Sequence, residues 1–212
     1  MNIYPVLLEL IEIRFHPMPL QRVLESLGTA VQQCDSAIDQ ATKSQDADYL
    51  EAVVGDECAV LENLLGAAFV TCQAEITAVV SHAMRIHADA KAQGHNLSSS
   101  DGTKNGILSI GQPIPGSTHT NVQVIDAFAN YFKHCEEWDQ SWTALAGRSK
   151  QTMDVISAMG AVEYGTGNLR AGVAALGIPD YKQLQLLSDH VVQWARAVKT
   201  GYESELRKNN LL

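Results

Sequence analysis

The chain of 212 residues is short of cysteine, and no two of its four cysteines have a C-x-x-C spacing. Small disulfide-rich proteins and zinc ribbons need closely and regularly spaced cysteines, so neither class fits this sequence. Each cysteine lies in a run with helical periodicity, which predicts free and mostly buried thiols. These cysteines are Cys34, Cys58, Cys72 and Cys135.

Basic residues are also few. The chain has 15 Lys and Arg against 24 Asp and Glu, which gives a formal net charge of −9. Proteins that bind the phosphate backbone of nucleic acids need clustered Lys and Arg, so the composition argues against general binding of that kind but leaves a local basic pocket open. Residues 1–15 have no basic residue before Arg14, and the apolar stretch at 64–80 is interrupted by Gln73 and Glu75. We therefore expect a cytoplasmic protein without a signal peptide or a membrane span.

The motifs of the common metal and nucleophile sites are missing as well. Neither Glu-x-x-His nor His-x-x-x-His occurs, which excludes the di-iron and zincin patterns. A Gly-x-Ser-x-Gly elbow is also absent. The glycines around Gly165–Asn168 have neither the Walker nor the dinucleotide spacing, and we interpret them as turn and capping residues. We expect no metal and no cofactor.

Helical periodicity dominates what is present. Apolar residues make up 46% of the chain, and they recur at spacings of three and four over long stretches. The pattern predicts an all-α bundle of five or six helices around the long helix at 49–90, which contains no proline. The expected helices are 5–13, 20–38, 49–90, 121–138, 148–159 and 180–207.

The boundaries of the domain follow from proline, glycine and serine. Residues 1–19 end in two prolines and are predicted to be an N-terminal extension of a single helical domain at 20–212. Met18 precedes a clean helix start, so whether residues 1–17 belong to the native chain is left open. Residues 93–120 are rich in Gly, Ser and Pro and predict a long loop, either a connector or a lid over a site. Within it, Ile107, Leu108 and Ile110 form a short strand or fasten the loop to the surface.

The segment at residues 126–142, most of which lies in the helix expected at 121–138, carries the best candidate site. Five of the thirteen aromatic residues of the chain lie in this window. At about 100° per residue, Asn130, Lys133 and His134 share a polar arc, whereas Tyr131 and Trp138 lie on the apolar arc and are candidate binding residues. The polar trio is either a solvated face or a site for an anionic or polar ligand. In the second case His134 serves as acid or base, Lys133 supplies charge and Asn130 orients the ligand.

Glu136 falls inside the apolar arc of the same helix. An ionised carboxylate in a core is costly unless it is paired or hydrogen-bonded. In the helix at 49–90, Glu75 and His82 lie on the flank of the apolar stripe in the same way. We therefore predict that the two helices pack together around a buried polar cluster of Glu75, His82 and Glu136, with His134 as a further member. The alternative is that these residues only make interhelical hydrogen bonds that fix the register.

The Asn-x-x-Lys-His run at 130–134, which follows a long helix, resembles motifs of HEPN-type all-helical proteins. Many members of that family are toxin or defence ribonucleases. The resemblance implies ribonuclease chemistry in which Asn130 and His134 are the polar and basic members. The family's ribonuclease signature is an Arg followed by four to six residues and a His, and no arginine of this chain has that spacing. The whole chain also resembles bacterial all-helical proteins.

Two functions are consistent with these observations. The first is a non-enzymatic binding or interaction protein of bacterial type, with its partner surface on the helix at 121–138 and on the 93–120 segment. Its partner is another protein or a second copy that forms a homodimer. The second is a HEPN-like ribonuclease or related hydrolase, which has RNA as a partner and uses a polar site. The residues of that site are His134, Asn130, Lys133 and Glu136, supported by Glu75.

Overall fold

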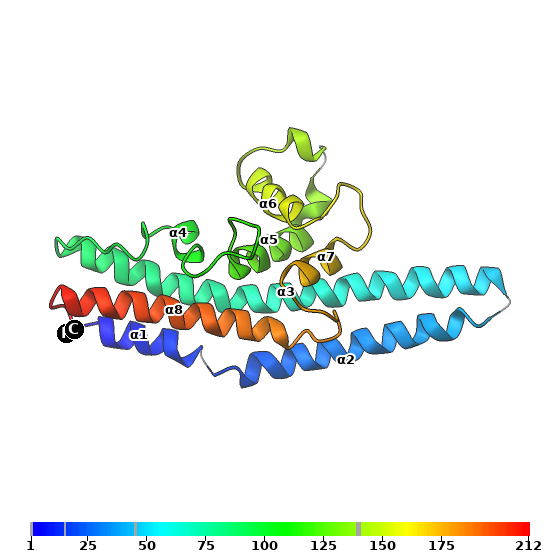
Figure 1. Ribbon diagram of the computed structural model, residues 1–212, viewed down its shortest axis with the longest axis horizontal. Coiled ribbons are helices and arrows are strands. Elements are labelled where there is room, and N and C mark those ends of the chain that lie inside the picture. Colours follow the sequence, from blue (N-terminus) through cyan, green and yellow to red (C-terminus); the bar gives the residue numbers. More distant parts are fainter. Residues whose placement is uncertain (1, 15, 45, 139–140) are drawn as a thin grey trace.

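The computed structural model describes residues 2–14, 16–44, 46–138 and 141–212. Over these residues the chain is helical and has no β-strand, which confirms the predicted all-α class. Figure 1 shows an elongated molecule whose helices are arranged along one long helix. The α-helices are α1 (Tyr4–Ile13), α2 (Met18–Ala41), α3 (Ala47–Ala92), α4 (Lys104–Leu108), α5 (Asn121–His134), α6 (Gly147–Ala158), α7 (Asn168–Ala175) and α8 (Leu186–Lys208), with 3-10 turns η1 (Cys135–Glu137) and η2 (Trp142–Ala144).

Helix α3 is the axis of the bundle. It has 46 residues and is therefore about 69 Å long. The carboxylate of Asp46 caps its start by accepting a hydrogen bond from the backbone N–H of Tyr49 at 3.1 Å. Helices α1, α2, α5, α7 and α8 all pack against α3. This arrangement confirms the expected bundle around the helix predicted at 49–90.

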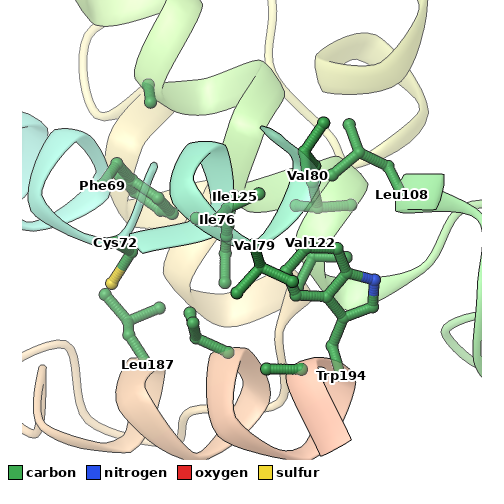
Figure 2. Close-up of a cluster of buried hydrophobic side chains, with 14 of the residues drawn as sticks. Phe69, Cys72, Ile76, Val79, Val80, Leu108, Val122, Ile125, Leu187 and Trp194 are labelled. Carbon is green, nitrogen blue, oxygen red and sulfur yellow. The ribbon is translucent and has the colours of Figure 1, made fainter. Parts of the chain in front are cut away.

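The main core lies between α3, α5 and α8, as Figure 2 shows. Phe69 of α3 stacks on Phe128 of α5, with ring centroids 5.4 Å apart. On the α8 side, Trp194 is buried, and its indole N–H donates to the carbonyl of Ile107 at 3.2 Å. Gly172 of α7 lies so close to the Phe128 ring that a Cβ there would be 2.8 Å from it. Bulky and small residues therefore interlock where three helices meet.

The N-terminal helix belongs to this core. Residues 4–13 form α1 as the proline pattern predicts, but α1 is not an extension outside the domain. Tyr4, Leu7, Leu8 and Ile11 are buried, and α1 packs against α3 and α8. The division at residue 19 was inferred from two prolines, but Pro17 is the N-cap of α2 and Pro19 lies in its first turn, where a fixed φ suits a helix start.

The 93–120 segment is packed onto the helices. The short-strand alternative for Ile107 and Leu108 is wrong, because both lie in α4 and are buried. The side chain of Thr103 starts α4 by accepting from the N–H of Gly106 at 3.1 Å. Just before α4, the Ser100 hydroxyl lies 2.7 Å from that of Tyr202 in α8. The alternative that these apolar residues fasten the loop to the surface is confirmed.

Two helix boundaries and one whole helix in the C-terminal half differ from those expected. Helix α5 ends at His134 instead of 138, and α8 begins at Leu186 instead of 180. Helix α7 was not predicted, because it lies in a glycine-rich stretch with little apolar periodicity. The turn and capping interpretation of 165–168 is confirmed: Gly167 precedes α7 with a φ of +82°, which only glycine adopts readily.

All four cysteines are free, as predicted. Cys34 and Cys72 are buried, whereas Cys58 and Cys135 are half-buried. Burial raises the pKa of the Cys34 thiol to about 11 and that of Cys72 to about 12. These two thiols are therefore protonated near neutral pH, which makes them weak nucleophiles.

Helix α3 is long and apolar enough to cross a membrane by length and composition alone. Its most apolar window of 18 residues has a mean hydropathy of 1.5, and half of that window is buried inside the fold. Core helices of soluble proteins meet the same two criteria, so the finding does not place α3 in a membrane. The expectations of no membrane span and of a cytoplasmic location stay predictions.

His190 of α8 is held as a neutral imidazole. Its Nε2 lies 3.1 Å from the carbonyl of Leu176, which can only accept, so Nε2 carries the proton. Nδ1 lies 2.9 Å from the side-chain amide of Asn121, from which it accepts. Burial lowers the pKa of His190 below its ordinary value, and the Leu176 hydrogen bond opposes this effect only in part. A second proton would place a donor against the Asn121 amide.

We expect stability to fall on mild acidification because of this histidine. Its pKa is lower in the folded state, so the unfolded chain binds more protons and the free energy of unfolding decreases as the pH drops below about 6.5. Urea unfolding between pH 7.5 and 5.5 measures the slope. The slope should be reduced in His190→Gln but not abolished, because burial also lowers the pKa of His82. The exposed His134 provides the control His134→Gln, and equal slopes in both variants would contradict the assignment.

Candidate functional site

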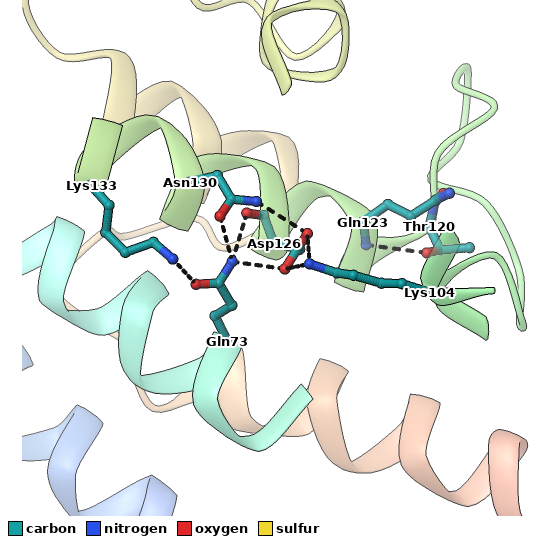
Figure 3. A network of polar contacts seen from close by, with 7 residues as sticks. All are labelled: Gln73, Lys104, Thr120, Gln123, Asp126, Asn130 and Lys133. Atoms are coloured by element: carbon teal, nitrogen blue, oxygen red, sulfur yellow. Dashed lines mark hydrogen bonds and ion pairs between the residues drawn. The ribbon is translucent and has the colours of Figure 1, made fainter. Parts of the chain in front are cut away.

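Helices α3 and α5 pack together, and a polar network lies between them, but it contains none of the four residues of the predicted cluster, Glu75, His82, Glu136 and His134. The centre of the network is Asp126 of α5, which is buried. Its carboxylate accepts from Lys104 Nζ at 2.8 Å, from Gln73 Nε2 at 2.7 Å and from Asn130 Nδ2 at 3.3 Å (Figure 3). Helices α3, α4 and α5 thus meet at one carboxylate.

Gln73 of α3 joins the two ends of the network. Its amide nitrogen donates to Asp126 and, at 3.0 Å, to the side-chain oxygen of Asn130, while its oxygen accepts from Lys133 Nζ at 2.7 Å. The reverse orientation would place the amide nitrogen against an ammonium group and the amide oxygen against a carboxylate. The charges of Lys133 and Asp126 therefore determine how the amide is oriented.

The start of α5 explains how Asp126 reaches this position. The Thr120 hydroxyl oxygen accepts from the N–H of Gln123 at 3.3 Å, and the Gln123 side chain accepts from the N–H of Thr120 at 2.8 Å. This capping box sets where the helix begins. The same hydroxyl donates to the carbonyl of Leu108 at 2.7 Å, which ties α4 to the start of α5 and brings Lys104 beside Asp126.

The chemistry of the network is that of an interhelical crosslink. The Asp126 carboxylate already accepts three side chains, and the amide groups of Gln73 and Asn130 are bonded to each other and to charged neighbours. A general base needs a free acceptor position that faces a substrate, and a binding site needs unsatisfied donors or acceptors. These side chains satisfy one another instead.

The predicted trio on α5 is divided between two environments. Asn130 and Lys133 belong to the network with Gln73. His134 is exposed, and its Nδ1 lies 3.1 Å from the carboxylate of Glu137, three residues later. The three side chains therefore do not converge on one ligand position. Their proposed catalytic and binding roles stay predictions.

Glu136 and Trp138 lie beyond the end of α5, and the expectation that Glu136 is buried is wrong. The α-helix stops at His134, and η1 turns Glu136 toward solvent, where it is exposed. Trp138 is half-buried and packs on Tyr131, with ring centroids 6.0 Å apart. The helical arc that placed Glu136 among apolar residues assumed a helix one turn longer than the real one.

The Tyr131 hydroxyl belongs to a small group of hydrogen bonds around Asn168, which the sequence did not predict. This hydroxyl accepts from Asn168 Nδ2 at 3.0 Å, and burial raises the pKa of the Tyr131 phenol. The buried Asn168 side chain also accepts from the N–H of Val162 and donates to the carbonyl of the same residue. Asn168 therefore closes the turn before α7 and joins it to α5, which favours a structural role for Tyr131.

Glu75 and His82 face α1, so the predicted cluster with Glu136 does not form. The Glu75 carboxylate accepts from the guanidinium of Arg14 at 2.8 Å. Burial, followed by the nearby charges of Arg14 and Arg85, lowers the pKa of His82. Because α1 was predicted to lie outside the domain, this face of α3 was expected to pack against α5.

The main hollows in the surface do not involve these residues. One of about 510 Å³ lies where residues near both ends of the described chain meet, and it includes Asn2, Tyr4, Asp89 and Gln93. Another of about 350 Å³ follows uncharged residues on the outer face of α2, such as Gln32 and Ser36. Within the described ranges, no group of three His, Cys, Asp or Glu side chains is placed to hold a metal ion.

A different surface is unusual in its composition. Figure 1 shows the C-terminal half of α2 and the N-terminal part of α3 extending beyond the other helices as an antiparallel pair. We call residues 31–60 the arm. Asp35, near the base of the arm, attaches it to the segment before α8: its carboxylate accepts from the Tyr181 hydroxyl at 2.6 Å and from Lys182 Nζ at 3.2 Å. In α3, residues 47–60 include no buried side chain, whereas buried positions recur from Leu61 onward.

An apolar stripe begins on the arm and continues along α3 past its base, where Leu64 packs against the core; its part on the arm is Tyr49, Val53 and Val60. At about 100° per residue, five apolar residues of α3 lie within an arc of about 60°. Tyr49 is 53% exposed and Val60 is 47% exposed, and the other three are half-buried. The stripe is about 27 Å long at 1.5 Å per residue. It consists of Tyr49, Val53, Val60, Leu64 and Ala67.

The arm is also strongly acidic. It has seven carboxylates and one basic residue, Lys43, a net charge of −6 out of −9 for the whole chain. At its base, Asp35 is paired with Lys182. The other six have no ion-pair partner among residues 2–14, 16–44, 46–138 and 141–212. On the α3 helix, Asp56 and Glu57 lie on the two edges of the stripe.

Comparison of the chain with protein-family models, with curated proteins and with solved structures finds no match. The resemblance of residues 130–134 to HEPN-type motifs therefore stays a prediction.

Proposed function

We propose that the protein is a non-enzymatic binding protein and that the arm is its partner-binding surface. The observation that carries this proposal is the apolar stripe. Large apolar side chains on a soluble surface are ordinary when they occur singly, but several of them on one helix face are typical of a binding interface. Tyr49 and Val60 lie on one helix face with Val53 between them, and they are half exposed or nearly so.

The arm is not the partner surface expected from the sequence, which was the helix at 121–138 together with the 93–120 segment. Residues 122–129 of α5 are all buried or half-buried against the rest of the fold, and Lys104 of the 93–120 segment is engaged by Asp126. The arm, by contrast, has neighbours on one side only. A helix of a partner that lies along the stripe would give α3 the second neighbour that its C-terminal half obtains from the core.

A panel of synthetic peptides tests this function. The peptides are 18-residue amphipathic helices that share one leucine face, with polar faces of Lys, Gln or Glu, and binding is measured by fluorescence polarisation. We expect the wild-type protein to bind at least one of them, and the double variant Tyr49→Ser/Val60→Ser to bind at least about tenfold more weakly, since burial of these side chains supplies the driving force.

The control carries the same pair of substitutions at another site. Val162 and Tyr164 are exposed near α7, far from the stripe in sequence, and Val162→Ser/Tyr164→Ser should bind like the wild type. If no peptide binds, or if the stripe variant binds as tightly as the wild type, the arm is not the partner surface. The ribonuclease alternative stays a prediction; His134 lies apart from the network that holds Asn130 and Lys133.

A further inference from the structure

We infer that the occupant of the arm is a basic amphipathic helix of another protein. This inference rests on the proposed function and adds the chemistry of the partner. The part of the stripe on the arm, from Tyr49 to Val60, accounts for an apolar face about three turns long on the partner. The charge of −6 on the arm, with Lys43 as its only basic residue, accounts for Lys and Arg on either side of that face.

The position of the carboxylates makes the match specific. Asp56 and Glu57 lie on the edges of the stripe, so a helix placed on Val53 and Val60 has a carboxylate on each flank. Asp56 is exposed, and Glu57 is half-buried beside Cys34. A lysine or arginine stem packs along apolar side chains while its charged end reaches the flanking carboxylate. The arm therefore offers both contacts that such a helix needs.

The same charges disfavour other occupants. A second copy of the chain would bring two arms of −6 against each other, and like charges across an interface are repulsive. Nucleic acid and anionic membrane surfaces carry the same sign as the arm. A neutral amphipathic helix would use the stripe but would leave the carboxylates without partners. Charge complementarity thus selects a basic partner among those that fit the stripe.

The peptide panel tests this inference through the polar faces. At 50 mM salt the Lys-faced peptide should bind at least about tenfold more tightly than the Gln-faced one, and the Glu-faced one should bind most weakly. Raising the salt to 300 mM should reduce the difference, because exposed charges are screened. The variant Asp56→Asn/Glu57→Gln keeps the shape of both side chains and should lose at least about threefold in affinity for the Lys-faced peptide alone.

The control variant is Glu136→Gln/Glu137→Gln, which removes an adjacent pair of exposed carboxylates outside the arm. It should bind like the wild type, which distinguishes a local effect from the net charge of the protein. Equal affinity for the Lys- and Gln-faced peptides, or an Asp56→Asn/Glu57→Gln variant that binds like the wild type, would overturn the inference. If the serine variant of the stripe is still weakened in that case, the proposed function survives.

Sedimentation of the protein without peptide tests whether a second copy of the chain occupies the stripe. We expect the mass of a monomer at tens of micromolar protein and 50 mM salt. A dimer that Tyr49→Ser/Val60→Ser converts to monomer would show that a second copy occupies the stripe, and the basic helix would be the wrong partner.

Discussion

Replacing Asp126 with alanine is expected to lower the free energy of unfolding by about 2 to 3 kcal/mol. The carboxylate accepts hydrogen bonds from Gln73, Asn130 and Lys104, and its removal takes one acceptor from the buried Gln73 amide and one from the half-buried Asn130 amide. A buried donor that loses its partner costs more than the bond itself contributes. Lys104 is nearly half exposed, so its ammonium can be hydrated and adds little to the loss.

Urea unfolding of Asp126→Ala measures this loss, and hydrogen exchange of α4 measures a second effect. Without its acceptor, Lys104 no longer fastens α4 to α5, so amide protection in α4 should fall more than in α8. Asp154→Ala provides the control, because Asp154 is exposed and pairs only with Lys150 four residues earlier. We expect a change within about 0.5 kcal/mol for it. A similar small change for Asp126→Ala would show that the network contributes little.

The same substitution at two glycines is expected to have opposite effects. In α2, a Cβ on Gly28 would lie 2.3 Å from the carbonyl oxygen of Lys182, which is backbone and cannot turn away as a side chain can. Gly28→Ala should therefore destabilise the protein by about 1 to 3 kcal/mol, although alanine favours a helix. In α3, nothing lies within 4 Å of a Cβ on Gly55, so Gly55→Ala should stabilise by about 0.5 to 1 kcal/mol.

The pair of variants is its own control, because both positions are helical and the chemical change is identical. Thermal and urea unfolding of the two proteins give the difference. If Gly28→Ala were as stable as Gly55→Ala, the contact between α2 and the 180–185 turn would be looser than the structure shows. That outcome would also weaken the case for an arm anchored at its base through Asp35 and Lys182.

The helices with regular apolar spacing were predictable from the sequence. The helices expected at 20–38 and 49–90 correspond to α2 and α3 with shifts of a few residues, because a long amphipathic pattern has one helical solution. The short helices were not predictable. Helix α4 has five residues and depends on the burial of Ile107 and Leu108, which is a tertiary effect. Helix α7 depends on small residues that fit against Phe128.

The sequence could predict that polar residues lie between two helices, but it could not predict which residues these are. A helix face with acidic residues beside apolar ones indicates an interhelical contact, and one exists between α3 and α5. Which residue meets which depends on the rotation of each helix and on where it ends. Asp126 was not among the residues predicted for the site, and Gln73 was interpreted only as an interruption of an apolar run. Their pairing requires knowledge of the partner helix.

The sequence contains a signal for the arm, but helical periodicity alone does not reveal it. Residues 35–57 contain seven carboxylates and one lysine while they keep the apolar pattern of a helix pair. An acidic stretch of this kind is usually a solvated surface. Only the packing shows that the helices leave Tyr49 and Val60 uncovered and that α1 occupies the face of α3 around Glu75.

The two parts of α3 therefore experience different surroundings within one unbroken helix. From Leu61 onward, its neighbours are supplied by the chain itself and are present at all times. Before that residue, α3 packs against α2 and has no buried side chain. Because the helix is continuous, any force applied to its exposed N-terminal part would be transmitted directly to the part that lies in the core.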